Sequence, residues 1–181
     1  MKLLDLLKEL SFEKRDVTLA SGRKSNFYID VKRASLTAEG AVLMGEGLLN
    51  LVKKHFPEAK AVGGLTLGAD PLATAVAYTS QLQKTPLEAF IVRKEAKGHG
   101  TGKLIEGGHR LPAQTPVVIV EDVVTTGGSG LEAYRKVKDH GWKVLGIVAV
   151  VDRDEGGREN IEKEGLKLYS LYRKSDFGIL N

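Results

Sequence analysis

Apolar residues follow two spacings along the chain, helical in some segments and continuous in others. The leucines between residues 3 and 10 fall at helical intervals and predict a short amphipathic helix. Thr37 is a suitable N-cap for a longer helix that runs to about Phe56 and is ended by Pro57. Apolar runs then alternate with helical segments, and the expected elements are a strand at 61–65, a helix at 71–83, strands at 89–93 and 117–120, a helix at 131–140 and a strand at 144–151.

This alternation predicts an α/β fold, with a parallel sheet that carries helices on both faces. Open parallel sheets bind ligands outside the carboxyl ends of their strands, and three segments should lie there. They are residues 63–70, the loop that begins at Arg93 and the turn that begins at Glu121. The connection between Lys94 and Pro116 is rich in glycine and charge and far longer than usual, which is typical of functional or disordered loops.

The turn after the apolar run at 117–120 carries the clearest chemistry. Glu121 and Asp122 offer carboxylates that can accept hydrogen bonds from vicinal ribose hydroxyls. Thr125 to Ser129 offer hydroxyls and backbone N–H groups at a predicted helix N-terminus, which favours a phosphate. An ordinary strand-to-helix connection without a ligand would look similar. The turn has neither a Walker A lysine nor a Gly-x-Gly-x-x-Gly spacing, so nucleotide hydrolysis and hydride transfer are disfavoured.

The long connection begins with a segment, Arg93 to Lys103, that concentrates cations among glycines. A solvated surface loop would have this composition. A cationic loop after a sheet strand can equally serve as a lid that neutralises a polyanion and excludes water. Lys97 and His99 are the catalytic candidates in the second case, since both could stabilise or protonate a departing anionic oxygen.

Two further segments offer groups for a planar, anionic substrate. Arg153 follows the last apolar strand, where its guanidinium could pair bidentately with a substrate carboxylate. A structural salt bridge with Asp152 or Asp154 is the alternative. Residues 19–28 lead into an extended segment that lacks the character of sheet core, and an aromatic residue there, such as Tyr28, could stack on a base.

Composition narrows the class of protein. With 181 residues and 42% hydrophobic content, we expect one α/β domain, at most with a small appendage. No apolar run approaches the roughly 20 residues that span a bilayer, and the N-terminus lacks a signal-peptide pattern, so a soluble cytoplasmic protein is expected. The chain has no cysteine, which excludes disulfides and thiolate catalysis. A net charge of +4 without a dense basic tract favours a small anionic substrate over nucleic acid.

These segments together resemble the type I phosphoribosyltransferases, and among them the orotate phosphoribosyltransferase family. Residues 121–129 are similar to the phosphoribosyl-diphosphate signature of the type I class. Further matches at 21–30, 93–100 and 151–153 narrow this class to the orotate enzymes. The resemblance covers nearly the whole chain. It implies a type I phosphoribosyltransferase-like parallel sheet flanked by helices, in a single domain with a hood at about 1–36 and a core at about 37–181. It also implies a homodimer whose loop 93–110 is shared across the interface, so that Lys97 and His99 act in trans.

The resemblance further implies transfer of ribose 5-phosphate from phosphoribosyl diphosphate (PRPP) to orotate in pyrimidine synthesis. Mg²⁺ would be bound mainly through PRPP and the released diphosphate, with few protein ligands. Catalysis is implied for Lys97 and His99, and orotate binding for Thr125, Arg153 and Tyr28. The residues implied for PRPP binding are Arg93, Lys94, Lys97, His99, Glu121, Asp122, Val123, Val124, Thr125, Thr126, Gly127, Gly128 and Ser129.

The chain departs from the family's sequence pattern at two positions, and two alternative functions stay open. Some relatives have lysine where this chain has Ala20 and Leu67, which leaves more of the charge compensation to the loop cations. A phosphoribosyltransferase for another base would share the turn but would not need Arg153 for a carboxylate. A PRPP-sensing regulator without catalysis should show a basic docking face or an added DNA-binding module, and the lysine and histidine at 97 and 99 argue against it.

Overall fold

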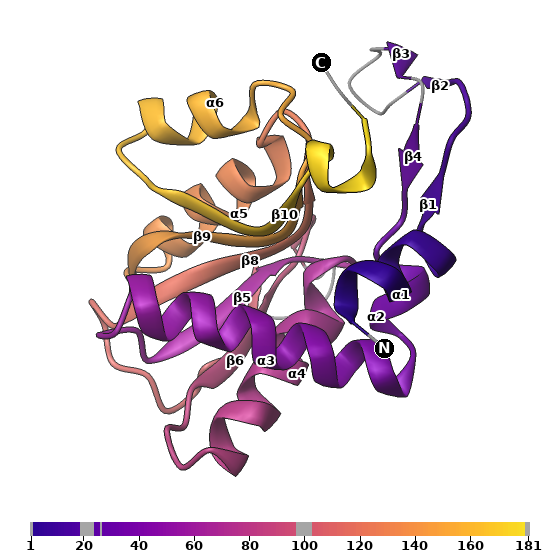
Figure 1. Ribbon diagram of the computed structural model, residues 1–181. Helices are drawn as coiled ribbons and strands as arrows, with labels where there is room; N and C mark the ends of the chain where they lie inside the picture. The colour runs from indigo at the N-terminus through magenta and orange to yellow at the C-terminus, as the bar shows by residue number, and fades with distance from the viewer. Residues whose placement is uncertain (1, 19–23, 26, 97–102, 180–181) are drawn as a thin grey trace.

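The computed structural model describes residues 2–18, 24–25, 27–96 and 103–179, arranged around a six-stranded sheet (Figure 1). The strand order is β10-β9-β8-β5-β6-β7, and β7 alone runs antiparallel to its neighbour in this sheet. The strands are β5 (Ala61–Leu65), β6 (Glu88–Val92), β7 (Ile105–Gly107), β8 (Pro116–Val124), β9 (Lys143–Asp152) and β10 (Leu168–Arg173). The helices are α1 (Leu3–Leu10), α2 (Lys32–Ser35), α3 (Ala38–His55), α4 (Ala69–Leu82), α5 (Gly128–Asp139), α6 (Gly157–Lys163) and the 3₁₀ helix η1 (Lys174–Phe177). The predicted α/β fold is confirmed.

The N-terminal segment forms two short antiparallel ribbons outside this sheet. β1 (Phe12–Glu13) pairs with β4 (Tyr28–Ile29), and β2 (Val17–Thr18) pairs with β3 (Lys24–Ser25). In Figure 1 the ribbons stand beside α1, to the right of the main sheet. The extended segment predicted near Tyr28 is therefore β4, and its separation from the sheet agrees with its mixed polarity.

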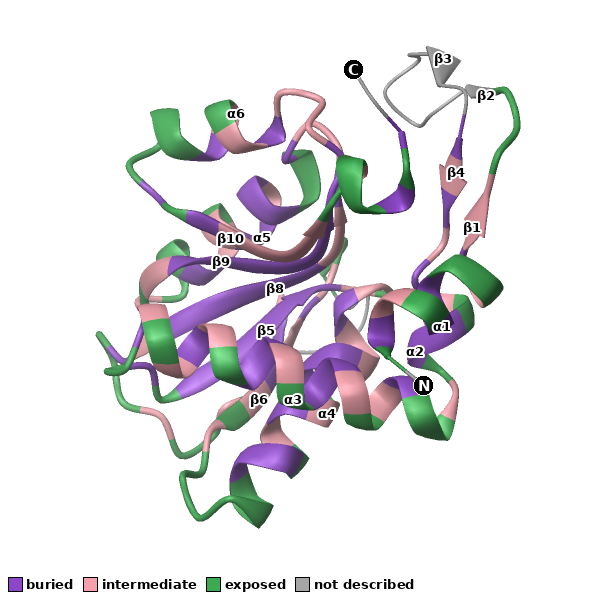
Figure 2. Ribbon diagram, in the orientation of Figure 1, coloured by how far each residue is buried: buried purple, intermediate pink, exposed green. Residues whose placement is uncertain are grey.

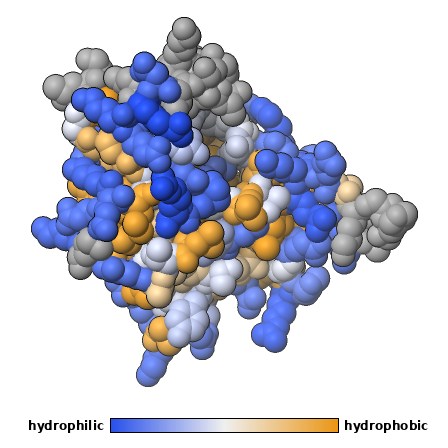
Figure 3. Space-filling view, turned by 90° about the vertical axis from the view of Figure 1, so that its right-hand side faces the viewer, coloured by the Kyte–Doolittle hydropathy of each residue, from blue (hydrophilic) through white to orange (hydrophobic). Residues whose placement is uncertain are grey.

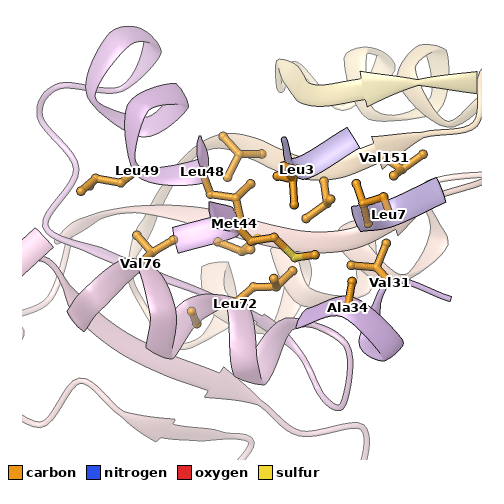
Figure 4. Packing of buried hydrophobic residues seen from close by; sticks show 14 of the residues in the cluster. Leu3, Leu7, Val31, Ala34, Met44, Leu48, Leu49, Leu72, Val76 and Val151 are labelled. Atoms are coloured by element: carbon orange, nitrogen blue, oxygen red, sulfur yellow. The ribbon is translucent and has the colours of Figure 1, made fainter. Parts of the chain in front are cut away.

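Alternate residues of the central strand β8 face two apolar layers. Val118 and Val120 pack in the cluster that α3 and α4 complete, whereas Val117 and Ile119 pack in the cluster under α5. All four side chains are fully buried, and the central strands are accordingly purple in Figure 2. Leucines of α1 reach the first cluster, where Leu3 and Leu7 lie close to Met44 of α3 (Figure 4). The N-terminal segment and the sheet therefore share one core.

The boundaries agree with the sequence at several elements and differ at the candidate site. Helix α1 has the predicted range, and α3 begins after Thr37, whose hydroxyl accepts a hydrogen bond from the Gly40 N–H at 3.0 Å. The expected strand at 117–120 was too short, because β8 continues to Val124 alongside β9. Its register pairs Glu121 with Ala149, so the acidic residues lie within the strand. Helix α5 begins three residues earlier than expected, at Gly128.

Two glycines in β5 are required by the close approach of neighbouring strands. A Cβ atom on Gly63 would lie 2.1 Å from the carbonyl oxygen of Phe90, and one on Gly64 would lie 2.2 Å from that of Val120. We expect Gly63→Ala to lower the free energy of unfolding by about 3 kcal/mol, since backbone atoms cannot move aside cheaply. Urea denaturation measures the loss. Gly128→Ala is the control, because its Cβ would meet nothing closer than 3.8 Å, and equal midpoints for the two variants would contradict the expectation.

Candidate active site

The acidic pair lies at the carboxyl end of β8, with its two side chains on opposite faces of the strand. Glu121 is 5% exposed and points toward α5, where its Cγ lies 3.5 Å from the position that a Cβ would take on Gly130. Asp122 points toward the β5–α4 turn, where a Cβ on Gly68 would lie 2.4 Å from the Asp122 Oδ2 atom. The two carboxylates therefore have different surroundings.

Burial gives Glu121 unusual proton affinity. Desolvation raises the pKa of its carboxyl well above the ordinary value, and the negative charge of Asp122 adds to this. The Glu121 Oε1 atom is buried and has no hydrogen-bond partner among the residues that the structure describes. Asp122 differs, because it is partly exposed and its Oδ1 accepts a hydrogen bond from the Val123 N–H at 2.8 Å.

A lysine that the sequence did not single out joins the N-terminal segment to this pair. The Lys32 ammonium, on α2, lies 2.8 Å from Asp30 Oδ1 and 3.8 Å from Asp122 Oδ2. Burial lowers the pKa of Lys32, but its hydrogen bond to Asp30 and the charges of Asp122 and Asp30 outweigh burial and raise it. No periodicity could have indicated a contact between residues so far apart in the chain.

The glycine turn lies between β8 and the N-terminus of α5, where the first N–H groups of a helix have no carbonyl partner within it. Gly127 caps the helix with φ +82°, a left-handed conformation that favours glycine. Gly128 and Ser129 are exposed at the helix start. Asn160 of α6 donates a hydrogen bond to the Thr126 carbonyl at 3.0 Å, which ties the turn to α6. The segment can therefore present backbone N–H groups to an anion.

The first cations of the long loop lie where β6 ends, beside a hollow. Arg93 Nη1 lies 3.3 Å from Glu106 Oε1, and the side chain of Lys94 is exposed. The hollow has a volume of about 660 Å³ and is lined by Thr66, Asp70, Ile91, Arg93, Lys94, Glu95, Ala96 and Glu106. Lys97 and His99, the catalytic candidates, lie outside the described residues.

Arg153 is held between the end of β9 and the N-terminal segment. It is 2% exposed, its Nε donates to Glu155 Oε1 at 2.9 Å, and its Nη2 donates to the Phe27 carbonyl at 3.4 Å. The guanidinium carbon lies 3.9 Å above the centre of the Phe27 ring. The pairing differs from the alternative considered from sequence, because Asp152 pairs with Arg158 and Asp154 with Arg173.

The other aromatic candidate, Tyr28, is the residue after Phe27. Its ring is partly exposed and lies 4.8 Å from the guanidinium carbon of Arg15. Tyr28 belongs to the β1–β4 ribbon, and the residue before it, Phe27, accepts the hydrogen bond from Arg153 through its carbonyl. The ring that stacks on the Arg153 guanidinium is therefore that of Phe27, and Tyr28 contacts Arg15 instead.

Two other kinds of site are absent from the described part of the chain. Within those ranges, no group of three or more His, Cys, Asp or Glu side chains is placed to hold a metal ion. None of the helices described is both long and apolar enough to cross a membrane.

Comparison with known proteins identifies the family. The family model of the phosphoribosyl transferase domain matches residues 60–170, which hold strands β5 to β9, the first half of β10, the acidic pair and the turn. An orotate phosphoribosyltransferase of Aquifex aeolicus is 47% identical over 178 residues, covering 97% of this chain and 95% of the relative. The chain belongs to the orotate phosphoribosyltransferase family. The resemblance seen in the sequence is therefore confirmed.

Solved structures of orotate phosphoribosyltransferases have the same architecture. The Mycobacterium tuberculosis enzyme in complex with PRPP is 40% identical with a TM-score of 0.79, covering 98% of this chain and 97% of that one. The enzyme of Aeropyrum pernix is 30% identical with a TM-score of 0.80, covering 97% and 95%. Unlike the family model, these matches extend over the N-terminal segment that carries Tyr28 and Lys32.

Proposed function

We propose that the protein transfers ribose 5-phosphate from PRPP to orotate, giving orotidine 5′-monophosphate and diphosphate in pyrimidine synthesis. The observation that carries this proposal is the 47% identity to an orotate phosphoribosyltransferase over nearly the full length of both chains. The arrangement at the carboxyl end of the sheet supports it. Groups suited to a phosphate, to ribose hydroxyls, to a diphosphate and to a carboxylate all lie at the ends of strands on this edge or on the turns that follow them.

PRPP is assigned to the acidic pair, the glycine turn and the loop stem. The 5-phosphate is accepted by residues 125–129 at the N-terminus of α5. The ribose hydroxyls donate to Glu121 and Asp122, and a hydroxyl would supply the partner that the buried Glu121 Oε1 lacks among the described residues. Diphosphate is assigned to the cations Arg93, Lys94, Lys97 and His99, of which Arg93 and Lys94 are among the described residues.

Orotate is assigned to Arg153, Thr125 and Tyr28. The orotate carboxylate pairs with the Arg153 guanidinium, whose orientation is fixed by Glu155 and by the Phe27 carbonyl. A guanidinium already oriented by other groups loses little freedom when a substrate binds. Uracil has no carboxylate for this partner, so the site discriminates between the two bases.

The reaction builds negative charge on the departing diphosphate and positive character on the ribose. Lys97 and His99 are the proposed catalytic residues, because cations there stabilise the leaving oxygens. Mg²⁺ suits this site, since it binds through one or two carboxylates together with phosphate oxygens, and Asp122 is the partly exposed carboxylate at this position. When bound, the ion supplies Lewis-acid stabilisation of the diphosphate.

We assign the hood to residues 1–36 and the core to 37–181 of a single domain. The leucines of α1 support this, because they pack in the same cluster as Met44 and Leu72. A cytoplasmic location also belongs to the proposal and agrees with a chain that has no cysteine.

The proposed function is tested by mixing the protein with PRPP, Mg²⁺ and orotate and following orotate by its ultraviolet absorbance. We expect loss of orotate that requires PRPP and matches the diphosphate released. Adenine, hypoxanthine and uracil serve as parallel substrates. Reaction of one of these in place of orotate would show that Arg153 has another role, and binding of PRPP without any reaction would favour a regulator.

The proposed active unit is a homodimer in which residues 93–110 reach the neighbouring site. Exposed apolar side chains support an interface: among the described residues, the exposed large hydrophobic ones lie on or beside α2, α3 and α4, and they are Leu36, Val42, Leu67, Tyr78 and Leu82. Figure 3 shows hydrophobic side chains among hydrophilic ones on the face that carries the hood. Apolar surface of this kind is typical of a contact between protein chains.

A single charge on α4 tests the interface. Tyr78 is 66% exposed, so Tyr78→Asp should leave the fold intact but place a charge in the apolar contact. Sedimentation should then show a mass of one chain where the unmodified protein shows two, and turnover should fall with it. Lys138→Asp on the exposed part of α5 is the control. A dimer that survives Tyr78→Asp at low protein concentration would place the contact elsewhere.

A further inference from the structure

One lysine of α5 holds the backbone from which the cationic loop begins. The Lys136 ammonium donates to the carbonyl oxygens of Arg93 at 3.0 Å and Lys94 at 2.7 Å, and to Glu132 Oε1 at 2.5 Å. An ammonium group has three N–H donors, and these three bonds use all of them. The side chain is 17% exposed, which limits competition by water.

The loop stem is fixed on its other side by β7. The Arg93 N–H donates to the Leu104 carbonyl at 2.8 Å, and the Arg93 guanidinium pairs with Glu106. The two carbonyls bound by Lys136 belong to the first residues after β6. A cation bound to two successive carbonyls fixes both peptide planes, and with them the direction in which the chain leaves the sheet.

The same helix begins at the glycine turn. Gly128 is the first residue of α5, and Lys136 follows about two turns later. A helix is stiff over this length, so the turn and the loop stem are kept at a fixed separation. In the proposed function the turn accepts the 5-phosphate and the stem carries cations for the diphosphate.

We propose that Lys136 is a positioning residue for PRPP, which sets the Arg93–Lys94 stem at a fixed distance from the 5-phosphate turn. The inference rests on the proposed function of these two segments. A site with a fixed separation favours a ligand that carries phosphate groups at both ends of the ribose. It gives no such advantage to orotate, whose assigned partner Arg153 lies at the end of another strand.

A neighbouring lysine provides a matched control. Lys138 lies on the same helix, is exposed, and has its ammonium 5.7 Å from the centre of the Tyr134 ring. Lys136→Met and Lys138→Met therefore make the same chemical change, and only the first removes the bonds to the loop stem. Lys136→Arg keeps a cation that can donate to two carbonyls.

Steady-state kinetics distinguishes positioning from a general loss of structure. We expect Lys136→Met to raise the KM for PRPP about tenfold and to leave the KM for orotate unchanged. Displaced binding groups weaken the binding of only the ligand that they contact. Lys138→Met should match the unmodified protein, and Lys136→Arg should recover most of the loss. Equal changes in both KM values, or equal behaviour of the two methionine variants, would overturn the proposal.

Hydrogen exchange gives a second readout that does not depend on turnover. The backbone amides of residues 93–96 should exchange faster in Lys136→Met than in Lys138→Met, while amides within β8 and β9 exchange alike. If the unmodified protein did not consume orotate, the proposed function would fail, whereas faster exchange confined to the stem would still establish the anchor. Unchanged exchange at residues 93–96 would contradict it.

Discussion

Replacing Arg153 with methionine should lower kcat/KM for orotate about a thousandfold, because the substrate carboxylate loses a charged, two-pronged partner. Arg153 is almost fully buried, so water cannot replace the guanidinium. The KM for PRPP should change little, since none of the groups assigned to PRPP includes Arg153. The preference for orotate over uracil should fall by nearly the same factor, which is measured by comparing kcat/KM for the two bases.

Folding must be separated from binding in this experiment. Arg153→Met also removes the guanidinium from Glu155, and breaking a buried ion pair commonly costs about 3–5 kcal/mol. The double variant Arg153→Met, Glu155→Gln should regain much of the lost stability without regaining orotate turnover. Arg153→Lys keeps the positive charge but loses the paired N–H donors of the guanidinium. Its activity should therefore lie between that of the unmodified protein and that of Arg153→Met. Full activity in a folded Arg153→Met protein would remove this residue from the site.

Glu121→Gln should weaken PRPP use and stabilise the fold in the same protein. The change replaces one carboxyl oxygen with an amide N–H donor, so a ribose hydroxyl loses an acceptor oxygen and kcat/KM for PRPP should fall about a hundredfold. Steady-state kinetics with PRPP as the varied substrate checks this. An unchanged kcat/KM would mean that Glu121 does not contact the ribose.

The gain in stability from Glu121→Gln should depend on pH. Burial raises the pKa of Glu121 above its ordinary value of 4.5, so the folded protein keeps this proton where the unfolded chain has lost it. Stability of the unmodified protein therefore falls as pH rises from 4.5 toward the folded pKa, and the cost is fully present above that pKa. Urea midpoints of the two proteins should nearly coincide at about pH 4 and diverge toward about pH 8 in favour of glutamine. A constant difference would assign the effect to packing.

The sequence predicted the turns that carry the chemistry better than it predicted their surroundings. Thr125 to Ser129 were placed at a helix N-terminus because glycine and hydroxyl residues between an apolar run and a helical pattern are a local signal. The same signal ended the strand too early at Glu121. Charged residues do not normally continue a buried strand, and only pairing with β9 keeps them in it.

Contacts between distant segments could not be obtained from local patterns. Lys32 of α2 lies near Asp122 at the end of β8, and Lys136 of α5 donates to the Lys94 carbonyl just after β6, although each pair is far apart in the sequence. Neither lysine differs in its sequence neighbourhood from a solvated surface lysine. Similarly, the sequence suggested the adjacent aspartates as salt-bridge partners of Arg153, whereas the turn after β9 brings Glu155 to it.

A crystal structure with orotidine 5′-monophosphate tests the assignment of the site most directly. We expect the phosphate at the backbone N–H groups of residues 125–129, a ribose hydroxyl at the Glu121 carboxylate, and the base carboxylate at the Arg153 guanidinium. These three contacts together would establish the carboxyl end of the sheet as the active site. A nucleotide bound with its phosphate away from the α5 N-terminus, or with its carboxylate away from Arg153, would contradict the assignment.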